Sequence, residues 1–203
     1  KHYFIWTHDS IGVGEDGPTH EPIEQLSTFR AMPNFYTFRP ADGAENVECW
    51  KVALNLNAPC AFVCSRQGLN PLDEAKFGSV ANGAYLIKES QNPQITLVAS
   101  GSEVGLCLEA ANLLESIDIG VNVVSAPCFD LLCEQESSYI NRIFAPQTKV
   151  LAVEAATALE WYKFADNVLG MSSFGASAPA DELFKHFGFS ATNVANIAKE
   201  MLK

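Results

Sequence analysis

Short apolar runs alternate with segments of helical spacing in the first third of the chain, and this alternation restricts the possible fold most strongly. The runs at Tyr3–Thr7, 35–38 and 61–64 are rich in aromatic and β-branched residues, which is typical of buried strands. Helical patterns begin near Pro22 and Asp42, between successive runs. A β-α-β-α-β order with helices of this length predicts parallel strands joined by right-handed connections.

A second alternation follows a stretch that is richer in Gly, Asn, Pro and Gln, at residues 67–94. Strands are predicted at Ile95–Ala99, 121–124 and 150–153, and helices after Ser102, near Leu131 and at 159–164. The last helix has the clearest helical spacing, carried by Val194, Ile197, Ala198, Met201 and Leu202. We therefore predict an α/β fold with two domains, residues 1–85 and 86–203, each with a mostly parallel sheet flanked by helices.

Composition restricts the class of partner. The chain carries 24 acidic and 13 basic side chains, a formal net charge of −11, which argues against binding to nucleic acid or to a membrane surface. No apolar run reaches about 18 residues, so no membrane-spanning helix is predicted, and no signal or transit peptide is recognisable. The six cysteines show no zinc-ligand spacing and are predicted to be reduced thiols of a cytoplasmic protein. Because the first residue is Lys1 and a strand follows at once, we expect a fragment of a longer protein.

The segment at residues 7–20, THDSIGVGEDGPTH, concentrates the reactive side chains. It holds two histidines, two aspartates, one glutamate and three glycines in fourteen residues. Glycine lets a backbone approach a ligand closely, and histidine and carboxylate side chains can transfer protons and bind hydroxyl groups. In parallel sheets, ligands bind beyond the carboxyl ends of the strands, and His8, Arg39 and Arg66 follow three predicted strands. The sequence therefore predicts a site at this edge.

Three other interpretations of this segment were considered. Gly12, Gly14 and Gly17 match the spacing of a dinucleotide-binding loop, but Glu15 and Asp16 inside it would repel a pyrophosphate. A metal site built from His8, Asp9, Asp16 and His20 is possible by ligand type, although the spacing matches no known motif. For Asp9 and Glu15 we favour a structural role, with the carboxylates bound to backbone amides. We predict no metal ligand in this chain.

The string THDSIGVGEDGPTHEPIEQL resembles the corresponding loop of transketolases. The resemblance continues, in order, through FRPAD (38–42), SRQ (65–67), SGSEV (100–104) and FGASAPADELFKHFGF (174–189), so it covers essentially the whole chain. The deoxyxylulose-phosphate synthases share a GEDGPTH-like core but differ in the THDSIG start and in the tail. The chain is therefore similar to the second half of the pyrimidine-binding domain of a transketolase followed by the C-terminal domain.

The resemblance implies a role for four residues. His8 and Arg66 correspond to residues that bind the substrate phosphate, and Asp16 corresponds to one that binds a substrate hydroxyl group. His20 corresponds to a catalytic histidine close to the thiazolium end of the cofactor, so it is both a catalytic and a cofactor-binding candidate. Arg39, in FRPAD, is expected to form a structural ion pair or a helix-start contact in preference to a contact with ligand.

Further expectations concern four side chains outside this set. Phe4 and Trp6 alternate within a strand, so we predict that both belong to the core. His2 and His186 are predicted to be surface residues.

The resemblance also implies cofactors and partners. Transketolases use thiamine diphosphate with Mg²⁺ (or Ca²⁺) to transfer a two-carbon ketol group between sugar phosphates in the pentose phosphate pathway, and they are homodimers. Most cofactor ligands and the catalytic glutamate lie upstream of the matching region, so the chain alone is expected to be inactive. The alternatives are a non-catalytic dimerisation or regulatory module and a deoxyxylulose-phosphate synthase-like enzyme.

Overall fold

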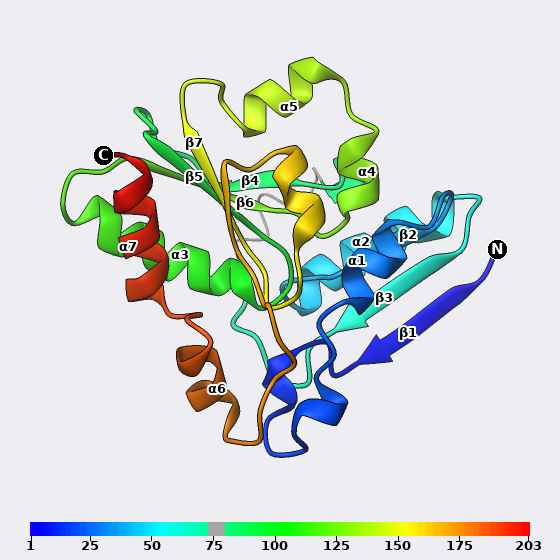
Figure 1. Cartoon of the computed structure of the whole chain (residues 1–203). Coiled ribbons are helices and arrows are strands. Elements are labelled where there is room, and N and C mark those ends of the chain that lie inside the picture. The colour runs from blue at the N-terminus through cyan, green and yellow to red at the C-terminus, as the bar shows by residue number, and fades with distance from the viewer. Residues whose placement is uncertain (73–79) are drawn as a thin grey trace.

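Two mostly parallel sheets, each covered by helices, form the protein (Figure 1). The computed structural model describes residues 1–72 and 80–203, so residues 73–79 of the predicted inter-domain stretch lie outside the described residues. The predicted α/β class with two mostly parallel sheets is confirmed. None of the helices in these two described segments is long and apolar enough to cross a membrane.

The first sheet has three strands in the order β1-β3-β2, and both pairs are parallel as predicted. The strands are β1 (Tyr3–Thr7), β2 (Tyr36–Phe38) and β3 (Cys60–Cys64). Thr7 pairs with Cys64 and Phe38 pairs with Phe62, so the carboxyl ends of all three strands meet at one edge.

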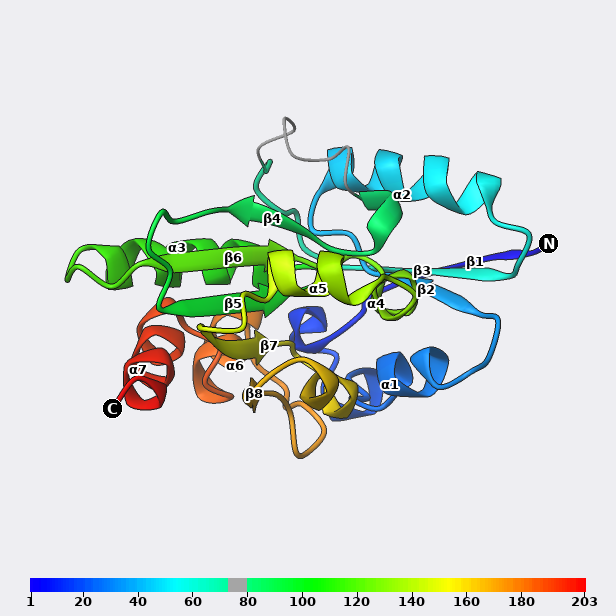
Figure 2. The same ribbon diagram turned by 90° about the horizontal axis from the view of Figure 1, so that it is seen from above.

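Helices α1 (Gln25–Arg30) and α2 (Gly43–Asn55) lie on opposite faces of this sheet (Figure 2). The alternation along β3 explains this: Phe62 packs in the same cluster as Cys49 of α2, whereas Ala61 packs with Leu26 of α1. The D-x-x-E pattern also forms as predicted. Asp42 is the N-cap of α2, and its carboxylate accepts a hydrogen bond from the Glu45 amide at 2.7 Å.

The second sheet has five strands in the order β4-β6-β5-β7-β8, and only β4 is antiparallel to its neighbour. The strands are β4 (Tyr85–Lys88), β5 (Ile95–Ala99), β6 (Val121–Ser125), β7 (Lys149–Val153) and β8 (Asn167–Leu169). The three central strands match the predicted runs. The two edge strands were not predicted, because β8 has only three partly exposed residues and β4 lies inside the stretch 67–94 that was interpreted as the link between domains.

Two groups of helices cover this sheet. One group packs with Leu97 and Leu151 and consists of α3 (Glu103–Glu115) and α7 (Ala191–Met201). The other group packs with Val98 and Ala152 and consists of α4 (Phe129–Cys133), α5 (Ser137–Ile143) and the 3-10 helix η4 (Leu159–Lys163). The alternation along β5 and β7 thus separates two apolar layers. Helix α6 (Ala180–His186) lies close to the 3-10 turn η1 (Ile11–Val13) of the first half.

A single apolar cluster extends through both halves, from Phe62 in β3 to Leu97 in β5 and Val194 in α7. The backbone continues the link, because Phe38 forms an isolated bridge with Cys128 and the Arg39 amide donates to the Pro127 carbonyl at 2.8 Å. The predicted domain boundary between residues 85 and 86 stays a prediction. β4, which begins at Tyr85, pairs within the second sheet.

The core assignment of Phe4 and Trp6 is wrong. These side chains are 42% and 40% exposed, because β1 is an edge strand of the described sheet and both of its faces are partly open, with Ile5 on the other face 61% exposed. The two rings stack on each other, with Trp6 also stacked on Phe29 of α1 at a centroid distance of 4.8 Å. Strand alternation predicted correctly that they share a face, but it does not report how fully that face is covered.

Candidate functional site

The segment that links β1 to α1 forms the centre of the candidate site. It contains two 3-10 turns, η1 and η2 (Pro18–His20), and no longer element. The backbone adopts positive φ at His8 (69°), Gly14 (83°) and Gly17 (84°). Glycine adopts this conformation at no steric cost, whereas His8 does so against its own preference. Residues 8–20 are called the substrate loop below.

His8 and Arg66 follow the carboxyl ends of adjacent strands, as the sequence predicted. Thr7 and Cys64 are paired, and His8 and Arg66 come one and two residues later. Both side chains are exposed, and the Arg66 guanidinium makes no ion pair with any residue in segments 1–72 and 80–203. His8 contacts Thr7, with 2.9 Å between Nδ1 and Oγ1. An exposed guanidinium without a carboxylate partner is available to bind an anion.

Gln67 holds the end of β3 against the substrate loop. A Cβ atom at Gly12 would lie 2.3 Å from Gln67 Oε1, so a larger residue there would push the end of the Gln67 side chain aside. The contact places the residue after Arg66 directly on η1.

Asp16 and His20 lie further along the same loop, and both are exposed. His20 Nδ1 is 3.1 Å from Thr19 Oγ1. No hydrogen bond joins any two of His8, Asp16, His20 and Arg66, which are the four residues singled out from the sequence and all belong to the described chain. Three of them share one loop and the fourth follows the neighbouring strand, and all four side chains are exposed.

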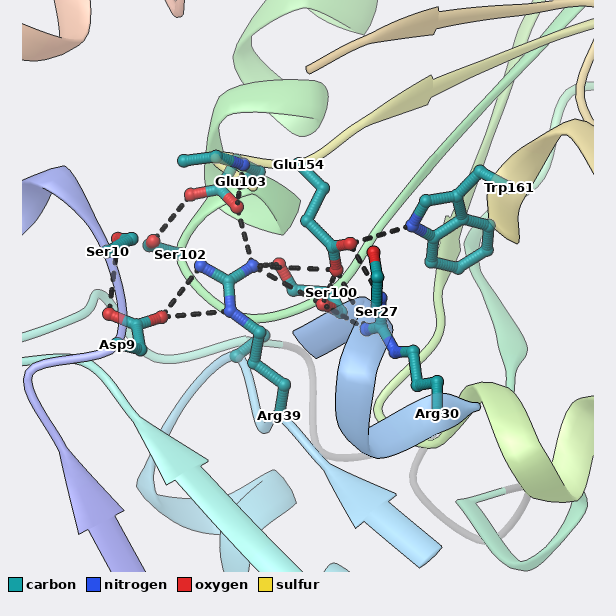
Figure 3. A network of polar contacts seen from close by, with 12 residues as sticks. Asp9, Ser10, Ser27, Arg30, Arg39, Ser100, Ser102, Glu103, Glu154 and Trp161 are labelled. Carbon is teal, nitrogen blue, oxygen red and sulfur yellow. Dashed lines mark hydrogen bonds and ion pairs between the residues drawn. The ribbon is translucent and has the colours of Figure 1, made fainter. Parts of the chain in front are cut away.

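Arg39 is buried and serves a structural purpose, as expected from the sequence (Figure 3). Its guanidinium contacts Asp9 Oδ2 at 2.7 Å, donates to the Ser100 carbonyl at 2.7 Å and pairs with Glu103 Oε2 at 2.5 Å. Burial opposes its charge, but the surrounding carboxylates of Glu103, Asp9 and Glu154 outweigh burial and raise the pKa of Arg39. The residue after β2 therefore faces the second half of the molecule and not a ligand.

A second buried arginine joins the same network from helix α1. Arg30 pairs with Glu154 at 2.6 Å and with Glu160 at 2.5 Å, and Trp161 Nε1 donates to Glu154 at 2.9 Å (Figure 3). Burial disfavours the charge on Glu154, yet Arg30 and then Arg39 outweigh burial and lower the pKa of Glu154 to about 2. Sequence reasoning missed Arg30 and Glu154, because nothing in their local pattern distinguishes a buried ion pair from two surface charges.

The structural role favoured for Asp9 holds, although its partners differ from those expected. The Asp9 carboxylate contacts Arg39 and accepts from Ser10 Oγ at 3.2 Å, whereas backbone amides were expected. The carboxylate that does accept a loop amide is Glu21, which takes the Gly14 N–H at 3.0 Å. Glu15 is exposed.

The dinucleotide and metal interpretations find no support in the geometry. After Gly12-x-Gly14-x-x-Gly17 the chain forms a 3-10 turn, and the next α-helix along the chain begins only at Gln25, so the strand–glycine loop–helix order of a dinucleotide-binding motif does not form. Within residues 1–72 and 80–203, no three His, Cys, Asp or Glu side chains are grouped as metal ligands would be.

Other side chains lie as the sequence suggested. His2 and His186 are exposed. All six cysteines are free, and four of them, Cys49, Cys60, Cys107 and Cys128, are buried. Burial raises the pKa of each of these four thiols.

Two protein families match consecutive parts of the chain. The family described as "Transketolase, pyrimidine binding domain" matches residues 1–71, and "Transketolase-like TK C-terminal domain" matches residues 83–190. Transketolase 2 of Aliivibrio fischeri is 44% identical over 206 residues, which cover 98% of this chain and 31% of that protein. The chain thus spans about a third of the length of the curated relatives it matches.

Solved structures agree in fold over the same length. The transketolase of Campylobacter jejuni superposes with a TM-score of 0.95 at 57% identity, covering 98% of this chain and 31% of that one. The transketolase of Leishmania mexicana gives 0.93 at 41% identity, covering 98% and 30%. The chain therefore belongs to the transketolase family and matches the C-terminal portion of its members, which contains the pyrimidine-binding and C-terminal domains.

Proposed function

We propose that the chain forms the substrate-facing side of a transketolase, which reversibly transfers a two-carbon ketol group from a ketose phosphate to an aldose phosphate. This reaction belongs to the pentose phosphate pathway. The observation that carries the proposal is the pair of exposed cationic or titratable side chains, His8 and Arg66, after adjacent paired strands. Related proteins support it: a Pichia stipitis transketolase that is 37% identical to this chain was solved with sedoheptulose-7-phosphate.

Arg66 and His8 bind the phosphate group of the substrate in this proposal. A charge-assisted hydrogen bond contributes about 1.5–3 kcal/mol, equivalent to roughly one to two powers of ten in affinity. Asp16 accepts a hydrogen bond from a substrate hydroxyl group, and a sugar of the wrong configuration leaves that carboxylate unpaired. His20 stabilises the hydroxyl groups near the reacting carbon and moves protons there.

Thiamine diphosphate, when bound, supplies the stabilised carbanion chemistry that breaks a carbon–carbon bond beside a ketone. The described residues fit one end of this cofactor. His20 is exposed at the end of the loop and has no carboxylate partner in segments 1–72 and 80–203. The same segments contain no acidic cluster that suits the accompanying Mg²⁺ (or Ca²⁺). We therefore assign the diphosphate and the metal ion to residues outside this chain, with a homodimeric parent enzyme in the cytoplasm.

Two substitutions in the full-length protein test the proposal. Arg66→Ala is expected to raise the KM for a ketose phosphate about 10- to 100-fold with a smaller change in kcat, because phosphate binding is lost. His20→Ala is expected to lower kcat by about two orders of magnitude, because proton transfer is lost. Steady-state kinetics with thiamine diphosphate and magnesium measure both effects.

The matched controls are Arg142→Ala and His2→Ala, which remove exposed side chains of the same type outside the loop; His2 lies at the opposite end of β1 from His8. Equal losses in the controls, or unchanged kinetics in both site variants, would contradict the assigned roles. The absence of two-carbon transfer by the wild-type protein would overturn the proposed function. The 203-residue chain alone is expected to be inactive and to show no tight binding of thiamine diphosphate by titration calorimetry.

A further inference from the structure

The substrate loop has little regular structure of its own to fix its shape. Its internal backbone hydrogen bonds are those of short turns, such as Val13 N–H to the Ser10 carbonyl at 3.1 Å and His20 N–H to the Gly17 carbonyl at 3.0 Å. His8 holds a positive φ of 69°, which a free loop would relax. The conformation that presents His8, Asp16 and His20 therefore depends on contacts outside the loop.

The first external contact holds the start of the loop. Asp9, only 3% exposed, accepts from Arg39 Nε at 2.9 Å, and the same guanidinium pairs with Glu103 Oε2 at 2.5 Å. Glu103 is fixed in turn, because Ser102 Oγ donates to it at 2.6 Å and the Ala155 amide at 3.1 Å. A chain of buried contacts thus runs from the second half of the molecule to the residue after His8 (Figure 3).

The second external contact holds the end of the loop. Ser177 Oγ donates to the Glu15 carbonyl at 2.7 Å, and the Gly175 amide donates to the Glu21 carbonyl at 3.4 Å. A Cβ atom at Gly175 would lie 1.7 Å from Glu21 Oε2, so the two segments touch closely. Glu21 also accepts the Gly14 amide, which ties this contact back into the loop.

We propose that the C-terminal half positions the substrate loop at both ends, through Glu103–Arg39–Asp9 at its start and through Gly175–Ser177 at its end. Arg39, Glu103 and Ser177 are positioning residues in this proposal: they contact no substrate, but they set the backbone that presents His8 and Asp16. The proposal rests on the proposed function for its kinetic consequence. Its structural consequence, a loop ordered by the second half, does not depend on activity.

The test compares two buried arginines in the full-length protein. Arg39→Lys keeps the charge but removes the forked contact to Asp9 and Glu103. Arg30→Lys disturbs a neighbouring buried pair with Glu154, which joins the same network through Ser100 but makes no contact with the loop. Donor cleavage without acceptor is measured for fructose 6-phosphate and for fructose. We expect Arg39→Lys to lower kcat/KM about tenfold or more for fructose 6-phosphate and about threefold or less for fructose. Arg30→Lys is expected to change both by the same factor.

Hydrogen exchange of the loop amides gives a readout that needs no activity. In Arg39→Lys, residues 9–20 are expected to exchange at least about fivefold faster than in Arg30→Lys. Ser177→Ala is the second variant, because Ser177 is exposed and its replacement should leave the protein folded even if Arg39→Lys does not fold. This variant should accelerate exchange at residues 15–20. Ser173→Ala, an exposed serine with no hydrogen bond among the described residues, is its control.

The outcomes separate the two proposals. Faster loop exchange in Arg39→Lys and Ser177→Ala but not in their controls supports positioning, even if the wild-type protein cleaves neither donor and the proposed function fails. Loop exchange equal to that of the controls overturns positioning, whatever the kinetics. Because Asp9 directly follows His8, equal losses for fructose and fructose 6-phosphate in Arg39→Lys also overturn the proposed effect of Arg39 on the phosphate contact of His8.

Discussion

Individual glycines differ sharply in what they contribute to this protein. Gly83 has a φ of 84°, and a Cβ atom there would lie 2.2 Å from the Leu132 amide nitrogen and 2.4 Å from the Cys128 carbonyl oxygen. Its carbonyl accepts the Cys128 amide at 3.0 Å, so the turn cannot move away without breaking a hydrogen bond. Gly105, within helix α3, has no described heavy atom within 4 Å of its Cβ position.

Gly83→Ala is therefore expected to destabilise the protein by about 2–4 kcal/mol, because backbone strain and overlap with neighbouring backbone add together. Gly105→Ala is expected to stabilise it by about 0.5–1 kcal/mol, because alanine loses less backbone entropy in a helix. Urea unfolding followed by circular dichroism measures both free energies. Equal effects of the two substitutions would contradict the argument.

Helix α2 illustrates how far local sequence signals determine an element. Asp42 accepts the Glu45 amide at 2.7 Å through one carboxylate oxygen and the Leu72 amide at 2.7 Å through the other. Glu45 accepts the Ala41 amide at 2.5 Å in return. The start of the helix is thus closed from both directions by the two acidic residues of the D-x-x-E pattern.

Asp42→Ala is expected to lower the free energy of unfolding by about 1–3 kcal/mol, because two amide donors lose their acceptor at a nearly buried site. Asp42→Asn keeps an acceptor for the Glu45 amide and should lose roughly half as much. Chemical denaturation of both variants provides the measurement. A loss in Asp42→Asn as large as that in Asp42→Ala would show that charge, and not the cap, stabilises this helix.

Elements with strong local signals were predictable, and those defined by distant partners were not. The cap of α2, the apolar face of α7 and each central strand are determined by residues that lie close together in the sequence. β8 has only three residues and is defined by its pairing with β7, and the exposure of Trp6 depends on what covers β1. Such information depends on tertiary contacts, which a local pattern does not contain.

At the scale of the whole molecule, buried charges join the two sheets. Arg30 and Arg39 come from the first half, and Glu103 and Glu154 come from the second. For the candidate site, the sequence indicated the loop and the strand ends, because both follow from local pattern. It did not indicate that Asp9 and Glu103 share Arg39 as a partner, because Arg39 is distant from Asp9 along the chain and Glu103 lies in the other half.

Glu154→Ala is expected to destabilise the whole chain by about 3–5 kcal/mol, since the Arg30 guanidinium stays buried without its main partner. A small loss of unfolding free energy in Glu154→Ala would indicate that solvent reaches Arg30.

The apolar cluster is continuous across both halves, so the two halves are expected to unfold in one common transition. The fluorescence of Trp50 and of Trp161, each kept as the sole tryptophan in its own variant, measures this. Two separate midpoints would show that the halves are independent units.

The free cysteines allow local opening of the folded chain to be measured by the rate of thiol labelling. Alkylating reagents attack the thiolate, and Cys49, Cys60, Cys107 and Cys128 are both enclosed and held in the protonated form by burial. The rate at which each becomes labelled in native buffer is therefore governed by how often its surroundings open. Cys60 lies in the first sheet and Cys107 in helix α3, so labelling would time the opening of the two halves separately without any engineered probe.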